Sequence, residues 1–305
     1  MKKIYFTGLF LFSIAANAQV TDTSSVMQLI DSISSTPKAN KYVKSTFKST
    51  RLINAHSVES LGKNELDIQI AHRFGTLNTG IYEFFGLDNA TFRLGIDYGI
   101  TKRLMIGIGR SSYEKQYDGF IKYKILWQQD GGMPVSLSAL AGMYINTLKP
   151  SDPNEEIFFR SRLDYVFQLL LARKFGEGFS LQISPTLVHR NLVPETTDKN
   201  DIIAFGIGAR QKITKRITIN GEYYYQLPDT KAAGSVNALS LGFDIETGGH
   251  VFQFMFTNST GIAENQYIAK TSGKWNDGDI HFGFNIRRVF ALGKRAKDNR
   301  KNENK

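Results

Sequence analysis

The stretch GIDYGITKRLMIGIGR (residues 95–110) places Ile-Thr-Lys-Arg between two runs in which apolar residues alternate with small or polar ones. The same four residues recur in GIGARQKITKRITINGEY (206–223), again between two alternating runs. Alternation with period 2 predicts β-strands, because successive side chains of a strand point to opposite faces. Each ITKR is therefore predicted to be a tight turn between two antiparallel strands. Shared turn chemistry explains the repetition, and an internal duplication is the alternative.

The alternation extends from Glu65 almost to the C-terminus. It divides into about twelve segments, each close to the roughly 9–11 residues that a tilted membrane strand needs. Short connections are predicted at 100–103, 128–134, 175–178, 213–216 and 246–249. Longer ones are predicted at 75–89, 147–157, 191–200, 227–237 and 259–278, with a briefer one near 112–117. Short periplasmic turns that alternate with longer outer loops are typical of outer-membrane barrels.

The first residues resemble a bacterial export signal. Lys2 and Lys3 precede an apolar run that is too short to span a bilayer of roughly 30 Å as a helix. Ala16-Asn17-Ala18 has the small-x-small pattern of a signal peptidase site. We expect cleavage after residue 18, with a membrane anchor as the alternative. No later window is apolar for 18 consecutive residues, so a helical membrane protein is excluded.

Composition narrows the remaining classes of protein. The 305 residues carry a formal net charge of +10 and contain no cysteine, which excludes disulfides, thiolate metal sites and cysteine nucleophiles. A soluble β-sandwich also alternates, but here the 22 Phe and 13 Tyr favour interfacial aromatic girdles. Glycines also gather on the polar face of the strands, where a closed barrel has little space. We therefore predict an all-β fold, a transmembrane antiparallel up-and-down β-barrel of about 12 strands.

The chain is predicted to divide into four parts: a signal peptide (1–18), an N-terminal periplasmic segment (19–63), the barrel (64–290) and a basic tail (291–305). The 41–63 stretch lacks a clear period, so it is predicted to be an extra strand, a strap or a plug in the lumen. The tail has six basic and two acidic residues and reads as disordered.

Five stretches together resemble a family of uncharacterised outer-membrane β-barrel proteins of Bacteroidota, a domain of unknown function. They are AHSVESLGKNELDIQIAHRFG (55–75), LGIDYGITKRLMIGIGRSSYEKQYDGFIKYK (94–124), SPTLVHRNLVP (184–194), LGFDIETGGHVFQFMFTNSTG (241–261) and GDIHFGFNIRRVF (278–290). The resemblance covers roughly residues 45–290 and implies a barrel in a Gram-negative outer membrane. It implies no catalytic residue.

The polar face of the strands is predicted to line the lumen. Its candidate charged residues are Arg93, Asp97, Lys122, Lys124, Arg160, Arg162, Asp164, Arg210, Glu222, Asp244, Glu246 and Arg287. Two interpretations remain open: a packed, salt-bridged interior without a pore, or a narrow channel or small-solute transporter with mild anion preference. If the N-terminal segment enters the lumen, the pore is plugged.

Other chemistry has weaker support. His72 and His189 are predicted to point outward, so a lipid-facing hydrolase is a third alternative, and we otherwise expect no enzyme. The acidic loops 151–156 and 196–201 match no calcium-loop spacing. We expect no catalytic residue, metal, cofactor or nucleic-acid partner. Expected partners are outer-membrane lipid and, through the basic tail, a periplasmic protein or peptidoglycan; a closed structural or partner-binding barrel is the alternative function.

Overall fold

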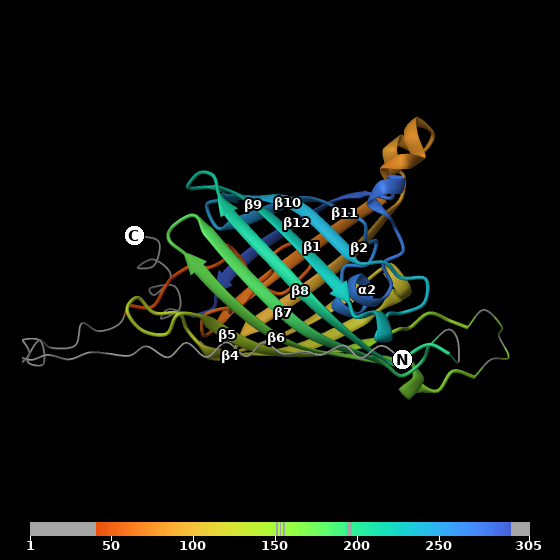
Figure 1. Ribbon diagram of the computed structural model, residues 1–305, viewed down its shortest axis with the longest axis horizontal. Coiled ribbons are helices and arrows are strands. Elements are labelled where there is room, and N and C mark those ends of the chain that lie inside the picture. The colour runs from red at the N-terminus through yellow and green to blue at the C-terminus, as the bar shows by residue number, and fades with distance from the viewer. Residues whose placement is uncertain (1–40, 151, 153, 155, 194–196, 294–305) are drawn as a thin grey trace, which may run out of the picture. The chain divides into compact units, whose positions relative to one another are not determined.

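The computed structural model describes residues 41–293, apart from 151, 153, 155 and 194–196. In this part of the chain twelve strands form one closed antiparallel barrel, in which every strand pairs with its neighbours in sequence and β1 pairs with β12 (Figure 1). The predicted signal peptide, residues 19–40 and the tail from residue 294 lie outside the described residues. The predicted strand number and fold are confirmed.

The strands are long enough to cross a bilayer at a tilt. They are β1 (Glu65–Thr76), β2 (Ala90–Gly99), β3 (Leu104–Ser111), β4 (Tyr117–Leu126), β5 (Ser136–Ile145), β6 (Leu163–Phe175), β7 (Phe179–Arg190), β8 (Asp201–Lys212), β9 (Ile217–Gln226), β10 (Ala238–Thr247), β11 (His250–Thr257) and β12 (His281–Ala291). Short helices occupy the loops: η1 (Leu77–Gly86), η2 (Tyr113–Lys115), η3 (Phe159–Arg162), η4 (Pro228–Thr230), α2 (Glu264–Ala269) and η5 (Trp275–Asp277).

The two ITKR segments are turns built in the same way. In the first, the N–H groups of Ile100 and Thr101 donate to the carbonyl of Leu104 at 2.9 and 3.1 Å, and the Thr101 hydroxyl accepts from the Leu104 N–H at 2.9 Å. In the second, Ile213, Thr214 and Ile217 repeat these bonds at 3.0, 3.1 and 3.0 Å. The repetition in the sequence therefore encodes one turn geometry, used at β2–β3 and again at β8–β9.

In the first turn the Arg103 side chain packs against the barrel instead of pointing freely into water. Its guanidinium lies 4.0 Å from the centre of the Trp127 ring and donates to the carbonyl of Ile125 at 2.8 Å. An arginine plane over an aromatic face is a cation–π contact. Arg216, at the matching place in the second turn, is exposed.

The wall has two chemically different faces. Outward apolar side chains stay exposed in the isolated chain, such as Ile108 (65%), Ile207 (52%) and Phe167 (50%). Inward polar side chains are buried, and Arg73 and Lys122 have no exposed surface. In water this exposure of apolar side chains would be costly, whereas the hydrocarbon core of a bilayer covers them. No helix in the described ranges is long and apolar enough to span a membrane.

Candidate functional site: a plug inside the barrel

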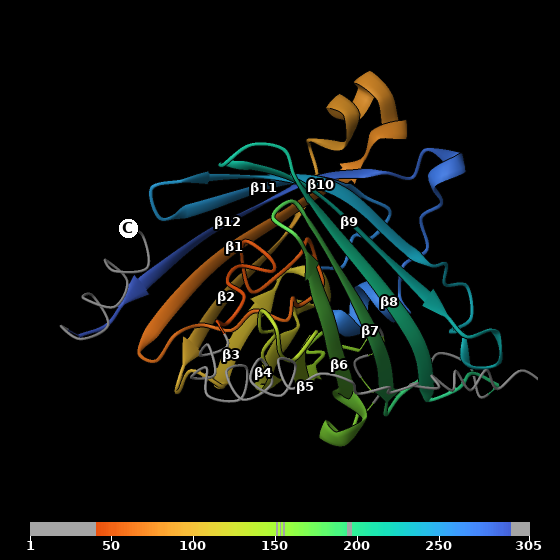
Figure 2. The ribbon, with the colours of Figure 1, turned by 60° about the vertical axis from the view of Figure 1, so that its left-hand side comes forward.

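Residues 45–61, here called the plug, fill the lumen from one end. Figure 2 shows this red-orange segment inside the barrel, and its Ser57 and Val58 have no exposed surface. The chain enters beside the β4–β5 turn, where the N–H of Val43 donates to the carbonyl of Gln128 at 2.9 Å. It leaves beside the first ITKR turn, where the N–H of Asn64 donates to the carbonyl of Gly99 at 2.8 Å. The plug is thus a loop with both ends at the rim of short turns.

Glu222 on β9 holds the innermost part of the plug. Its carboxylate accepts hydrogen bonds from the backbone N–H groups of Ile53, Asn54 and Ala55 at 3.3, 2.9 and 3.1 Å. The plug has no strand partner for these three donors, and a buried N–H without a partner is costly. A single wall carboxylate therefore fixes the backbone of the innermost part of the plug.

Basic wall side chains bind the carbonyl groups of the plug. Lys124 donates to Val58 at 2.9 Å, and Lys122 donates to Ser57 at 3.2 Å. Arg210 donates to the carbonyl of Thr46 at 2.9 Å. Hydrogen bonds with an ionised partner are stronger than neutral ones. The charged lumen is consequently satisfied by the backbone of the plug as well as by opposite charges.

The amide side chains of the wall add a second set of contacts to the plug. Gln182 accepts from the N–H of Val58 at 2.7 Å and donates to the carbonyl of His56 at 2.8 Å. Asn285 donates to the carbonyl of Ile53 at 2.9 Å. Amides carry both donors and acceptors, so they match the alternating groups of an irregular backbone.

A smaller apolar contact accompanies the polar ones. Phe47, Leu52 and Val58 of the plug pack with Leu170 and Ala172 of β6. Space for the Leu52 side chain exists because position 208 is glycine. A Cβ atom there would lie 2.3 Å from Cδ2 of Leu52. The polar-face glycines of the sequence thus make room for the plug at this position.

The loop between β11 and β12 closes the lumen from the other end. It carries α2, all of whose residues are buried. Glu264 of α2 pairs with Arg51 of the plug at 2.6 Å and accepts from the Tyr144 hydroxyl at 2.7 Å. The plug and α2 therefore meet inside the barrel through a buried ion pair.

His56 lies beside this ion pair, with Nε2 at 3.6 Å from the Glu264 carboxylate. Its ring packs edge-on against Phe120, with ring centres 4.4 Å apart. Burial, followed by the positive charges of Arg51 and Lys122, lowers the pKa of the His56 imidazole well below its usual range. The imidazole is therefore neutral at pH 7.

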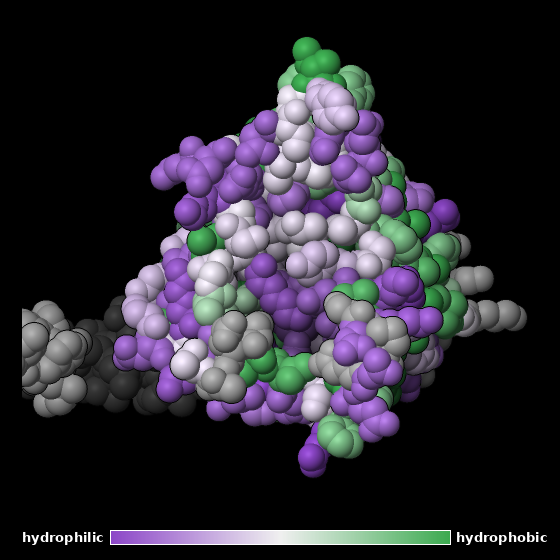
Figure 3. All heavy atoms as spheres, turned by 90° about the vertical axis from the view of Figure 1, so that its right-hand side faces the viewer, coloured by the Kyte–Doolittle hydropathy of each residue, from purple (hydrophilic) through white to green (hydrophobic). Residues whose placement is uncertain are grey.

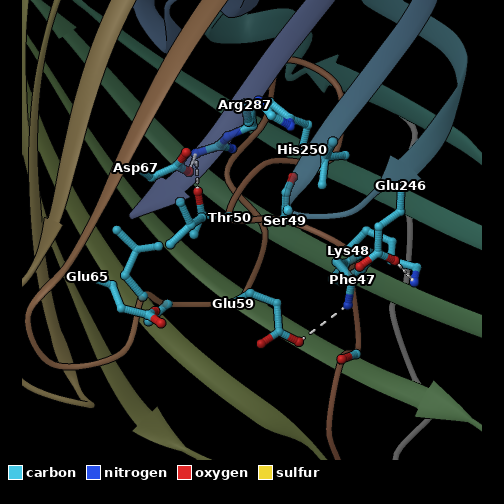
Figure 4. Close-up of a pocket in the computed structure, with 16 residues that line it drawn as sticks. Phe47, Lys48, Ser49, Thr50, Glu59, Glu65, Asp67, Glu246, His250 and Arg287 are labelled. Carbon is cyan, nitrogen blue, oxygen red and sulfur yellow. Dashed lines mark hydrogen bonds and ion pairs between the residues drawn. The ribbon is translucent and has the colours of Figure 1, made fainter. Parts of the chain in front are cut away.

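A cavity remains on each side of this contact. The one at the short-turn end has a volume of about 240 Å³ and lies between the plug and β1, β10, β11 and β12. Figure 4 shows Arg287 directed at Asp67 and Thr50, and Lys48 directed at Glu246, all around this cavity. The Lys48–Glu246 ion pair and the hydrogen bond from Arg287 to the Thr50 hydroxyl therefore connect the plug to the wall near the short-turn end.

The outer cavity is larger, about 590 Å³, and α2 forms part of its floor. Lys270 lines it and pairs with Glu114 at 2.7 Å, with Asp164 at 3.8 Å. Arg190 also lines it and donates to the carbonyl of Lys199 at 2.8 Å. Figure 3 views this end and shows hydrophilic residues gathered at its centre. We call this cavity the outer vestibule.

Nine of the twelve predicted lumen charges lie on strands and are buried. They are Arg93, Asp97, Lys122, Lys124, Asp164, Arg210, Glu222, Asp244 and Arg287. Most of them contact the plug, the α2 loop or one another, as Arg287 does with Asp97 at 3.3 Å. Arg93 instead pairs with Asp118 on β4, with Nε at 2.9 Å from Oδ1.

The other three predicted lumen charges are Arg160 and Arg162, which lie outside the strands, and Glu246, which lies at the rim of the short turns. Arg160 and Arg162 belong to η3, before β6 begins, where side chains do not alternate between two faces as they do in a strand. Arg160 is exposed, and Arg162 donates to the carbonyl of Leu148 at 2.6 Å, so neither projects into the lumen. Glu246 lies near the end of β10, with its side chain 44% exposed and paired with Lys48.

Several site residues were not identified from the sequence. Arg51, Asn54, His56, Tyr144 and Glu264 form the inner contact between plug, wall and α2, yet none belongs to a recognisable motif. The sequence indicated the plug only indirectly: residues 41–63 lack a clear hydrophobic period, so a plug was one of the alternatives for this segment. Nothing comparable marked the α2 loop, because its side chains follow neither a helical nor a strand pattern over a useful length.

The two outward histidines do not assemble a hydrolytic site in the described part of the chain. His189 uses both ring nitrogens, with Asp201 at 2.7 Å and Asn191 at 2.9 Å. His72 stacks on Phe284, with ring centres 4.9 Å apart. Neither imidazole hydrogen-bonds a serine hydroxyl among the described residues. These residues also contain no group of three or more His, Asp or Glu that could hold a metal ion.

Comparisons with known proteins agree with the barrel. The family model described as "Membrane bound beta barrel domain (DUF5777)" matches residues 47–290, which include most of the plug. No curated protein matches the chain.

Three of the solved structures that resemble part of the chain are described as porins or as an outer membrane channel. The NanC porin has a TM-score of 0.46 at 9% identity, over 75% of this chain and 100% of that one. The KdgM porin has a TM-score of 0.44 at 8% identity, over 75% and 99%. An outer membrane channel from Pseudomonas putida F1 has a TM-score of 0.45 at 12% identity, over 76% and 98%.

Proposed function

Because the chain belongs to the family of membrane-bound β-barrel domains DUF5777, we propose that it is an outer-membrane conduit for small polar solutes that the plug holds closed. The supporting observation is the way in which the plug is bound. Its backbone is held by wall side chains, with Glu222 on the N–H groups and Lys122, Lys124 and Arg210 on the carbonyl groups. On release, water replaces both sets of hydrogen bonds, so the net cost of opening is far below the sum of the bonds.

The path of the chain supports opening from the periplasmic side. The plug enters and leaves at the rim of short turns, which is the periplasmic end in barrels of this layout. It can therefore withdraw as a loop without threading an end of the chain through the barrel. The outer vestibule, lined by Lys270, Arg190, Glu114 and Asp164, would receive the solute.

Once the plug withdraws, the buried strand groups that hold its backbone would be more often basic than acidic, with Lys122, Lys124 and Arg210 against Glu222. The carbonyl ligands of Lys122, Lys124 and Arg210 would be lost, whereas Arg93 would keep its partner Asp118. Rings of charge set ion selectivity in pores. We therefore expect an open state with mild preference for anions, and a smaller preference in the variant Lys122→Gln/Lys124→Gln.

Conductance in planar bilayers tests the proposal. The plug precedes β1, so a chain that begins at Asn64 lacks it without any break in the barrel. We expect a low, rarely open conductance for the full chain and a steady, larger one for the shortened chain. Heat-modifiable gel mobility of both proteins verifies the barrel. Equal currents from two folded proteins would contradict a gating role for the plug.

A closed structural barrel is the second candidate, and the buried contact between plug and α2 favours it. The Arg51–Glu264 pair joins two segments that enter from opposite ends. If α2 alone seals the barrel, the shortened chain stays closed, and further removal of residues 262–270 would be needed for current. A barrel that conducts in neither form would be structural.

A further inference from the structure

The loop between β1 and β2 carries four apolar side chains that touch little else in the protein. In η1, Ile81 is 82% exposed, Tyr82 93%, Phe84 60% and Phe85 48%. Single exposed apolar residues are common on protein surfaces, but four within five positions form a patch that marks an interaction site. We call these four side chains the η1 tip.

The direction of η1 distinguishes it from the other loops. Figure 1 shows it at the outer end of the barrel, beyond the wall formed by β1 and β2. Figure 3, which looks along the barrel from that end, shows the same loop outside the outline of the wall, with an apolar tip. The axis of a membrane barrel runs roughly along the bilayer normal, so a loop that projects sideways from the outer rim lies over the lipid.

The base of the loop is fixed in this direction. The N–H of Leu77 donates to the carbonyl of Ile280 at 2.8 Å, and the Asn78 amide donates to Asp279 at 2.8 Å. Gly75 and Gly86 approach so closely that a Cβ on Gly86 would lie 2.4 Å from the Gly75 carbonyl carbon. The sideways projection is therefore built into the backbone.

The tip also holds an unfavourable backbone conformation. Phe84 and Phe85 both have positive φ, 46° and 55°, a region that aromatic residues rarely adopt. Such strain persists only when the surroundings compensate it. Both rings are about half exposed or more, so the protein supplies little of that compensation.

Directly below η1 the wall is aromatic. Phe74 stacks with Phe282 at a ring-centre distance of 5.9 Å, and His72 stacks with Phe284 at 4.9 Å. These rings lie near the outer ends of β1 and β12 on the lipid face, where barrels carry an aromatic girdle. The η1 tip thus continues a surface that lipid already covers.

We propose that the η1 tip is a lipid-binding anchor that inserts Ile81, Tyr82, Phe84 and Phe85 into the interface of the outer leaflet. Tyr and Phe are favoured at that depth, because the ring is apolar and the tyrosine hydroxyl reaches water. Glu83, the one charge in η1, is half-buried and accepts from Asn89 at 3.4 Å, so its carboxylate is directed at the base of the loop.

Site-directed fluorescence in vesicles tests the anchor on the full chain. The protein has no cysteine, so Tyr82→Cys gives a single site for a nitrobenzoxadiazole label. Leu192→Cys is the matched control, since Leu192 is 55% exposed at the same end but lines the outer vestibule. Ile81→Cys is a second tip site if Tyr82→Cys folds poorly.

In phosphatidylcholine vesicles we expect the tip label to be quenched by lipid with a doxyl group at acyl carbon 5. We expect iodide in the buffer to quench it at least threefold less than the control label. The control should show the opposite pattern. Tip labels that iodide quenches as strongly as the control, with no effect of doxyl lipid, would overturn the proposal and leave η1 as a water-exposed surface for a protein.

Discussion

The wall and the plug both bury backbone N–H and carbonyl groups away from water, but these groups find their hydrogen-bond partners in different ways. In the wall these groups bond between neighbouring strands, and in the plug they bond to side chains such as Glu222 and Lys124. Strand pairing depends little on which residue stands at each position, whereas the plug depends on a few named side chains. Single substitutions of the side chains that hold the plug should therefore release the plug and leave the wall folded.

The largest effect is expected at the pair that joins the plug to α2. Glu264→Gln leaves the buried Arg51 guanidinium without its carboxylate, which costs about 3–5 kcal/mol in comparable buried pairs. Hydrogen exchange should show faster amide exchange in the plug and in residues 258–280, with unchanged exchange in the strands.

A double variant sharpens this prediction. Arg51→Met with Glu264→Gln removes the uncompensated charge, and the glutamine can still accept from the Tyr144 hydroxyl. Protection should return for most of the plug. Exchange that rises equally in wall and plug for the single variant would show that the two regions are not separable.

The next effect concerns the space for Leu52. Gly208→Ala would place a Cβ 2.3 Å from its Cδ2, and overpacking of this kind costs typically about 1–3 kcal/mol. Labelling of an Ala55→Cys reporter by a water-soluble maleimide should accelerate, and Leu52→Ala in the same chain should reverse it. Gly119→Ala is the control, since its Cβ would meet only a carbonyl oxygen at 3.8 Å. Equal acceleration in both glycine variants would point to a general weakening of the wall.

A smaller effect is expected from pH. The pKa of His56 is lowered in the plugged state by burial and by Arg51, Lys122, Arg93 and Arg287, with Glu264 as the nearby acid. Protons therefore bind more readily when the plug is released, so stability of the plugged state is full above about pH 6.5 and declines as pH falls below it.

Bilayer recordings between pH 7 and pH 5.5 check this sign. Channel openings should become a few-fold more frequent at the acidic end, and His56→Gln should remove the part of the change centred near the ordinary imidazole pKa. A pH response that His56→Gln leaves intact would assign it to other groups.

The smallest effect belongs to the wall itself. Thr101→Val and Thr214→Val each remove the hydroxyl acceptor from one ITKR turn, worth about 0.5–1.5 kcal/mol of unfolding free energy. Both should lower the free energy of unfolding in urea by similar amounts and leave plug labelling unchanged. Clearly unequal losses would show that the two turns are not equivalent.

This contrast also explains how far the sequence could be interpreted. The strands followed from alternation, because Leu66, Ile68 and Ile70 share a face whatever the loops do. Alternation wrongly placed Arg160 and Arg162 on the lumen face, since η3 interrupts the strand pattern just before Leu163. The plug could be suspected but not placed, because its contacts join residues far apart in the chain, as Asn54 and Glu222 do.

The central claim is that the plug closes the barrel reversibly, and single-channel current from a tethered plug measures it most directly. Glu222→Gln weakens the three N–H contacts at the innermost part of the plug, so openings should become roughly tenfold more frequent, which corresponds to about 1.4 kcal/mol. Asn54→Cys with Ser240→Cys, at side chains that hydrogen-bond at 2.9 Å, allows a reducible bridge between plug and wall in that background. We expect the bridge to abolish the openings and reduction to restore them. Currents that persist unchanged with the bridge in place would contradict closure by the plug.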